Sequence, residues 1–193
     1  MKTFRFVGLA LLLCSSGLSV AQEVSRTAHG VKLEVPGEKF NCEVQFYTPS
    51  IVRVVKYPQA TMPEEKSLAV VLSPTEDIKF KVNETDDAVI LKSAAVTVTL
   101  DKQEGTLSFA DLQGNALLTE QGEPSFKPYQ EGADKGYYRV CQAFRLDKDE
   151  AIYGLGQLQT GKMSQRNQQK YLIQSNLEDS SPFFQSVKGY GLY

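Results

Sequence analysis

The chain has no tryptophan and only one histidine, His29, among its 193 residues. A zinc site normally needs several histidine or cysteine ligands, and the sequence contains no Cys-x-x-Cys motif to supply them. A serine–histidine–acid triad would have to use His29, which lies in a segment near the amino terminus. We therefore expect no metal centre and no histidine-dependent triad.

An excess of charge of one sign is also missing. The 21 lysine and arginine residues are offset by 23 aspartate and glutamate residues, which leaves a net charge of −2. Both signs are scattered, and no basic stripe is present that would neutralise phosphates, so nucleic acid is not an expected partner. The acidic residues mostly lie in turns or alternate with apolar residues. The run Asp147-Lys148-Asp149-Glu150 is interpreted as a solvated turn.

Long apolar runs are absent as well, apart from a short one near the amino terminus. Residues 1–21 combine Lys2 and Arg5, the apolar run 7–13 and the small residues that end at Ala21, which is the pattern of a cleavable signal peptide. The run is too short to span a bilayer, so no membrane anchor is expected. Cys14 raises a lipoprotein alternative, but the small residue that lipidation requires before the cysteine is replaced by Leu13. We expect a periplasmic or secreted protein.

Two cysteines, Cys42 and Cys141, remain after cleavage in an oxidising compartment. Both fall in predicted strands near opposite ends of residues 22–193. They either form a bridge across the domain or serve as two small buried apolar residues, and the sequence leaves both interpretations open.

Apolar residues recur at every second position over short runs between residues 31 and 151. Val96, Val98 and Leu100 alternate with Thr97 and Thr99, and similar alternation surrounds Val44–Phe46 and 78–82. A period of two is typical of half-buried antiparallel strands, and turn signals separate the runs at short intervals. The sequence therefore predicts an all-β antiparallel sandwich in one domain. The segment 161–172 lacks an apolar helical stripe and is predicted as a loop followed by a strand.

Consecutive hairpins are predicted in the middle of the chain. Residues 95–100 and 106–110 are joined by 101–105, where Gly105 suits a left-handed position, and a turn at 112–115 leads into 116–119. A slip of one residue would turn the buried valines outward, so the register is fixed. Residues 122–136 are rich in proline, glycine and charge and are predicted as a long loop, before a strand that starts at Tyr137.

Two glycine clusters beside aromatic residues mark the carboxyl-terminal part. Tyr153-Gly154-Leu155-Gly156-Gln157 is followed by Pro182-Phe183-Phe184 and then by Lys188-Gly189-Tyr190-Gly191. Glycine allows positive φ and close backbone approach, so such clusters indicate loops or bulges with tight packing. The first cluster is not a dinucleotide fingerprint, because the third glycine is replaced by Gln159.

These motifs, in this order and spacing, resemble the amino-terminal β-sandwich domain of glycoside hydrolase family 31, the α-glucosidase and α-xylosidase family. The resemblance implies a galactose mutarotase-like supersandwich over residues 22–193, with a catalytic (β/α)8 barrel that follows it and is absent from this chain. In that family the nucleophilic aspartate lies in a tryptophan-containing motif of the barrel. Because the chain has no tryptophan, we assign it no catalytic residue.

The implied parent enzyme hydrolyses terminal α-linked xylose or glucose from oligosaccharides with retention and without a cofactor. Its sandwich contributes a loop to the mouth of the active site, expected here within residues 162–181. Arg166, Gln174 and Asn176 are the candidate sugar-binding residues, because they offer hydrogen-bond donors and acceptors. The partners implied are the oligosaccharide substrate and the barrel of the same polypeptide.

Two details qualify these residues. Asn167 replaces a glycine that follows the corresponding arginine in the family, so the local backbone is expected to differ. The amides of Gln157 and Asn176 are more similar to the α-xylosidase members than to the α-glucosidase members. Gln174 and Asn176 alternatively cap strand ends.

Two other functions fit a β-sandwich. One is a free-standing carbohydrate-binding module, in which the nine tyrosines replace the usual tryptophan platforms, and the other is a structural or chaperone-like domain of the periplasm without a ligand. A reading frame that continues beyond Tyr193 through a Trp-x-Asp-Met strand would favour the hydrolase, and a stop codon would favour the module. Residues 189–193 are expected to end at an incompletely paired sheet edge.

Overall fold

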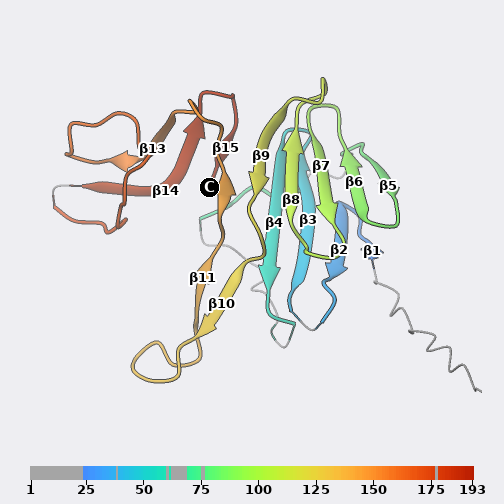
Figure 1. Cartoon of the computed structure of the whole chain (residues 1–193), viewed down its shortest axis with the longest axis horizontal. Coiled ribbons are helices and arrows are strands. Elements are labelled where there is room, and N and C mark those ends of the chain that lie inside the picture. The colour runs from blue at the N-terminus through green and yellow to red at the C-terminus, as the bar shows by residue number, and fades with distance from the viewer. Residues whose placement is uncertain (1–23, 38, 60, 62–68, 75–76, 177) are drawn as a thin grey trace, which may run out of the picture.

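The computed structural model of the chain describes residues 24–37, 39–59, 61, 69–74, 77–176 and 178–193. Within these ranges every regular element is a β-strand, and every strand pair is antiparallel (Figure 1). The predicted all-β antiparallel class is confirmed. The predicted signal peptide, residues 1–21, lies outside the described residues. No helix in the described part of the chain has the length and apolar character needed to cross a membrane.

The strands form four sheets. The first has the order β1-β2-β3-β4, the second β12-β9-β8-β7-β6-β5, the third β10-β11 and the fourth β13-β14-β15. Their bounds are β1 Val24–Arg26, β2 Gly30–Glu34, β3 Asn41–Thr48, β4 Ile51–Tyr57, β5 Lys81–Glu84, β6 Ala88–Lys92, β7 Thr97–Asp101, β8 Leu107–Ala110, β9 Ala116–Glu120, β10 Ser125–Pro128, β11 Tyr138–Cys141, β12 Phe144–Arg145, β13 Ile152–Gln157, β14 Asp179–Ser186 and β15 Gly191–Leu192.

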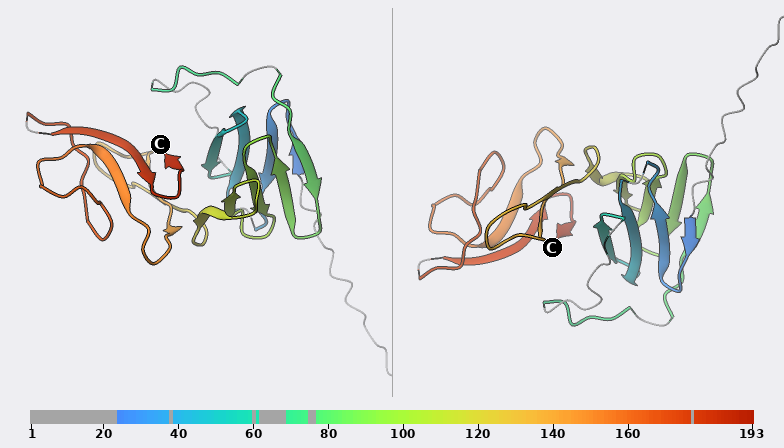
Figure 2. Two further views of the ribbon diagram at one scale, coloured as in Figure 1. Left: turned by 90° about the horizontal axis from the view of Figure 1, so that it is seen from above. Right: turned by 90° about the horizontal axis from the view of Figure 1, so that it is seen from below.

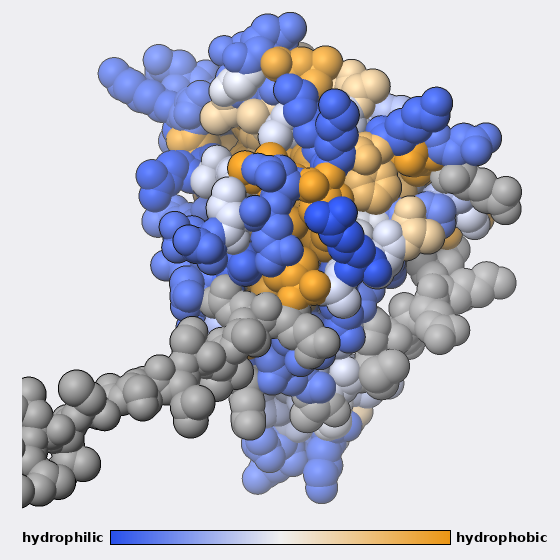
Figure 3. Space-filling view, turned by 90° about the vertical axis from the view of Figure 1, so that its right-hand side faces the viewer, coloured by the Kyte–Doolittle hydropathy of each residue, from blue (hydrophilic) through white to orange (hydrophobic). Residues whose placement is uncertain are grey.

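The first two sheets face each other and share one hydrophobic core, and the β13–β15 sheet lies to one side of them (Figure 2). Val98 and Leu100 of β7 are fully buried, and Val96 just before that strand is buried too, whereas Thr97 and Thr99 are partly exposed as predicted. Seen from the side of β1 and β5, apolar surface appears among mainly hydrophilic side chains (Figure 3). Partly buried apolar residues of this region, such as Phe80 and Val82, pack against the core.

The predicted hairpins are present. β7 pairs with β8, and β8 pairs with β9, while Gly105 adopts a φ of 63° in the first turn. The prediction of a long loop over residues 122–136 was wrong in part. Ser125–Pro128 forms β10, which pairs with β11 from Ser125↔Cys141 to Pro128↔Tyr138. A four-residue strand that ends in proline carries too little alternation to stand out from turn-like composition.

The cysteines do not form a bridge, since both thiols are free. Cys42 is fully buried in β3, and burial raises its pKa to about 12, so this thiol is an inert core residue. Cys141 is exposed at the end of β11. The interpretation as two buried residues therefore holds for Cys42 alone.

An ion pair links the two large sheets at one edge. Lys56 of β4 lies 2.5 Å from Glu120 of β9, and the side chains are 8% and 5% exposed. The same Glu120 oxygen accepts a hydrogen bond of 2.7 Å from the backbone amide of Leu107. Burial raises the pKa of Glu120, although the hydrogen bond and charge of Lys56 oppose this effect. The ion pair is therefore buried at the edge of the core, where it connects β4, β8 and β9.

We predict that Lys56→Met destabilises the fold by about 3 kcal/mol at pH 7, because the buried Glu120 carboxylate loses its cation. The raised pKa means that the folded state keeps the Glu120 proton at pH values where the unfolded state has released it. The loss should therefore be smaller near pH 4.5, where the folded carboxyl is more protonated. Urea unfolding at both pH values measures this, with the exposed Lys92→Met as the control. An equal loss at both pH values would contradict the explanation.

Candidate functional site

The candidate site is built on the sheet β13-β14-β15, which contains the glycine motifs. β13 pairs with β14 from Ile152↔Ser186 to Gln157↔Asp179, and the register shifts between Gly154 and Gly156. β15 pairs with β14 and forms an edge of this sheet, as expected for residues 189–193. The predicted bulge with tight packing is therefore present in β13.

The two glycines of the bulge are required for two separate reasons. Gly154 and Gly156 have φ angles of 115° and 94°, in the region that side chains rarely adopt. A Cβ on Gly156 would lie 1.9 Å from the carbonyl oxygen of Asp179, and one on Gly154 would lie 2.6 Å from that of Phe183. Leu155 between them also has a positive φ, of 68°, which is uncommon for a bulky residue. The bulge is thus a strained feature held by its pairing with β14.

A buried carboxylate lies just before this strand. Glu150 is only 3% exposed, although the run 147–150 forms the predicted turn, with the Glu150 amide donating to the Asp147 carbonyl over 3.2 Å. The interpretation of this run as solvated surface charge was wrong for Glu150. One carboxylate oxygen accepts hydrogen bonds from the hydroxyls of Ser186 at 2.5 Å and Tyr190 at 2.6 Å. The other accepts the Asp147 amide at 2.9 Å.

These contacts set the protonation of the cluster. Burial by itself would raise the pKa of Glu150. The hydrogen bonds from Ser186, Tyr190 and Asp147, together with the charge of Lys188, outweigh burial and lower the pKa. Burial and the neighbouring Glu150 raise the pKa of Tyr190 well above its usual value. The cluster is therefore an ionised carboxylate that accepts from neutral hydroxyl groups at neutral pH. The cluster was missed from the sequence because Ser186 and Tyr190 lie 36 and 40 residues from Glu150 along the chain.

The loop between β13 and β14 folds back toward Glu150. Residues 158–176 contain no helix or strand, and the next strand begins only at Asp179. The prediction for 161–172 was therefore correct about the loop and wrong about the strand that was expected to follow it. The Gln165 amide donates to the Ile152 carbonyl at 2.7 Å, and Arg166 Nη1 donates to the Glu150 carbonyl at 2.8 Å. Asn167 adopts a φ of 57°, a left-handed conformation that asparagine tolerates and glycine favours.

The three candidate sugar-binding residues do not form one cluster. Arg166 is bonded at the start of β13, whereas Gln174 contacts Asp179 and Ser180, which pair with the far end of that strand. The strand rise places these positions on the order of 20 Å apart. The Gln174 amide donates to Asp179 Oδ1 at 2.8 Å and accepts the Ser180 amide at 3.0 Å, which is the strand-capping alternative. Asn176 is exposed nearby.

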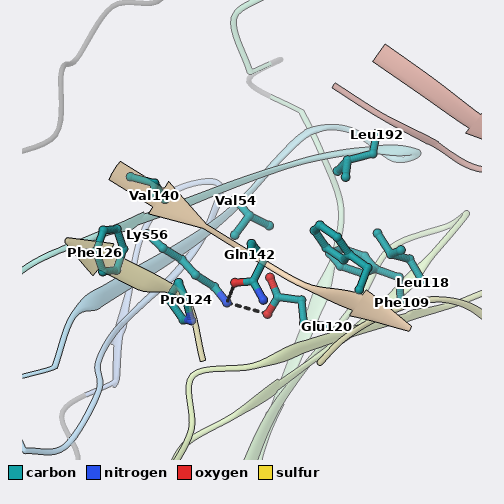
Figure 4. Close-up of a pocket in the computed structure, with 11 residues that line it drawn as sticks. Val54, Lys56, Phe109, Leu118, Glu120, Pro124, Phe126, Val140, Gln142 and Leu192 are labelled. Carbon is teal, nitrogen blue, oxygen red and sulfur yellow. Dashed lines mark hydrogen bonds and ion pairs between the residues drawn. The ribbon is translucent and has the colours of Figure 1, made fainter. Parts of the chain in front are cut away.

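A separate pocket lies beside the Lys56–Glu120 ion pair, with a volume of about 240 Å3 (Figure 4). Its walls are mostly apolar, and Gln142 accepts a hydrogen bond from Lys56 at 3.3 Å. Arg166, Gln174 and Asn176 do not line it. In the described part of the chain, no group of three or more histidine, cysteine, aspartate or glutamate residues is arranged to hold a metal ion.

Comparison with known proteins places this geometry in a family. Residues 41–193 match the glycosyl hydrolase 31 N-terminal galactose mutarotase-like domain. The chain belongs to this family. An α-xylosidase of Saccharolobus solfataricus is 29% identical over 162 residues, which cover 79% of this chain and 22% of that protein. An α-glucosidase of Bacillus thermoamyloliquefaciens is 27% identical over 165 residues, or 77% of this chain and 20% of that protein.

Solved structures of family 31 enzymes are also similar to this chain. The glycoside hydrolase family 31 α-xylosidase of Xanthomonas citri has a TM-score of 0.76 and 32% identity, and it aligns over 86% of this chain and 18% of its own. The family 31 α-xylosidase from a soil metagenome, complexed with xylose, has a TM-score of 0.72 and 25% identity, over 88% of this chain and 27% of its own. The chain spans about a fifth of the length of the curated relatives it matches.

We predict that Gly156→Ala destabilises the domain by roughly 3 kcal/mol, because the new Cβ would be strained by its φ and would clash with the Asp179 carbonyl. Gly161→Ala is the matched control. Gly161 also has a positive φ, of 68°, but no atom lies within 4 Å of a Cβ built there, so its cost should be only about 1 kcal/mol. Urea unfolding of both variants measures the difference. Equal costs would show that φ strain, and not the close approach of β14, requires the glycine.

Proposed function

We propose that this domain is the amino-terminal part of an exported α-glycoside hydrolase that removes terminal α-linked xylose or glucose from oligosaccharides with retention. The observation that carries the proposal is the match of residues 41–193 to the family 31 amino-terminal domain, together with relatives named as α-xylosidase and α-glucosidase. Residues 1–21 would direct export to the periplasm or the exterior. Residues 22–193 would form the folded domain, and the catalytic barrel would come from the same polypeptide.

Within this function the domain supports the mouth of the active site and supplies none of its chemistry. Retaining hydrolysis requires two carboxyl groups about 5–5.5 Å apart, one as nucleophile and one as acid/base. Glu150 is unsuited to either role, because its carboxylate is buried and already accepts three hydrogen bonds. The reacting carboxylates would come from the barrel, and no cofactor is needed for this chemistry.

We assign the direct sugar contact first to Asn176. Its side chain is exposed at the end of the loop, and its amide offers both a donor and an acceptor to sugar hydroxyls. Gln174 has both amide atoms bonded to the protein, so its contribution is to hold the start of β14 beside Asn176. Arg166 is anchored through Nη1 and keeps further N–H donors for a hydroxyl group. Xylose is favoured over glucose by the amides of Gln157 and Asn176.

The first test separates the domain from the enzyme. The 193-residue chain should release no xylose or glucose from α-linked oligosaccharides, because it lacks the carboxylate pair, whereas the product of a continuing reading frame should release one of them. Product analysis by chromatography with both proteins at equal concentration measures this. Release of sugar by the shorter chain would overturn the proposal, and sugar binding without hydrolysis by either protein would favour a carbohydrate-binding module.

A second prediction concerns Asn176 in the longer enzyme. Asn176→Ala should raise KM about two- to ten-fold for an oligosaccharide and leave KM for an aryl glycoside unchanged, since the amide would contact only the leaving-group sugar. Initial-rate kinetics on both substrates measure the effect, with the exposed Gln103→Ala in the β7–β8 turn as the control. Equal changes on both substrates would mean that Asn176 has a structural role.

A further inference from the structure

The segment 150–152 binds two other segments on opposite sides. The Glu150 carbonyl accepts a hydrogen bond from Arg166 Nη1 at 2.8 Å. The Ile152 carbonyl accepts one from the backbone amide of Gln165 at 2.7 Å. The carbonyl between them, of Ala151, accepts the Val187 amide at 3.2 Å. Successive carbonyls of an extended chain point in opposite directions. The loop 158–176 and the turn after β14 are therefore bound to the same three residues from two sides.

The Glu150 side chain fixes these three residues. Its carboxylate is buried and accepts from the Ser186 and Tyr190 hydroxyls, which come from the end of β14 and the turn before β15. Hydrogen bonds to a charged acceptor are stronger than those between neutral groups. Lys188 adds an ion pair of 3.0 Å to Asp147, at the other end of the Glu150 turn. The position of the 150–152 carbonyls thus depends on the turn 186–190.

We propose that Glu150 is a positioning residue for the loop 158–176, and that Tyr190 acts on this loop through Glu150. The Tyr190 hydroxyl donates to the Glu150 carboxylate, and its effect passes through that residue to the Glu150 carbonyl and then to Arg166. The role of this loop at a sugar-binding mouth rests on the proposed function. The coupling between Tyr190 and the loop rests only on the contacts within this chain.

Hydrogen exchange of the 193-residue chain tests the coupling. Tyr190→Phe removes one hydroxyl donor to the carboxylate and should speed local exchange in residues 158–170 about ten-fold, with unchanged exchange in β6, β7 and β8. Tyr193→Phe is the matched control, because Tyr193 is 63% exposed, and it should change neither region. Faster exchange confined to residues 186–193 would overturn the proposal, since the loop would then be independent of Tyr190.

Glu150→Gln provides a second variant. The amide nitrogen cannot accept the Asp147 amide, so the same loop should exchange faster than in Tyr190→Phe, provided that the core strands stay protected. If the Glu150→Gln variant unfolds, the exchange rates of Tyr190→Phe alone decide whether Tyr190 is coupled to the loop.

In the longer hydrolase, Tyr190→Phe should raise KM for an oligosaccharide with little change in kcat, because it displaces the mouth and not the reacting carboxylates. Faster loop exchange with unchanged KM would support the coupling between Tyr190 and the loop. It would contradict the proposed location of this loop at the mouth of the active site. Unchanged loop exchange would overturn the coupling, whatever the kinetics.

Discussion

Burial of alternating apolar side chains between two antiparallel sheets is the constraint on which the rest of this structure depends. β3 and β7 illustrate it: Cys42, Val44 and Phe46 meet the side of the core formed by Val98 and Leu100. Each fully buried side chain of this kind contributes roughly 1.5–3 kcal/mol relative to exposure. A strand that slipped by one residue would expose this whole set, so the core also fixes the registers of the surrounding strands.

The carboxyl-terminal sheet is held by a different kind of interaction. Its strands contribute few buried apolar residues, with Ile152 the one member of the buried hydrophobic set. Cohesion comes instead from close backbone contact at Gly154 and Gly156 and from the carboxylate of Glu150. Such a sheet tolerates a long irregular loop, because the loop is attached through backbone carbonyls and needs no hydrophobic face of its own.

This organisation supports the proposed function, in which the domain would hold the mouth of a site supplied by the rest of the polypeptide. The chain belongs to the family 31 amino-terminal domains, and it spans about a fifth of the curated relatives that it matches. The loop 158–176 exposes both polar and apolar side chains. Arg166 is bonded just before β13, and Gln174 is bonded to the start of β14, which pairs with the far end of β13. Anchors at both ends hold an otherwise irregular segment in one conformation, which is the preorganisation that a binding loop needs.

The sequence by itself determined the all-β class, the β7–β8–β9 hairpins and the family, because these depend on local alternation, on turn residues and on an ordered set of short motifs. It also indicated the tight bulge at Gly154 and Gly156, because two glycines this close together in a strand favour positive φ angles and close backbone approach. It gave no sign of β10, whose four residues carry too little pattern.

Only the tertiary structure decided the roles of Glu150 and Arg166. A glutamate in a charged run is usually solvated, and its burial depends on Ser186 and Tyr190, which are 36 and 40 residues away along the chain. The separation of Arg166 from Gln174 likewise follows from the path of a loop that has no periodic pattern. Contacts between distant segments are fixed by the way sheets pair and pack, and no local window of sequence contains that information.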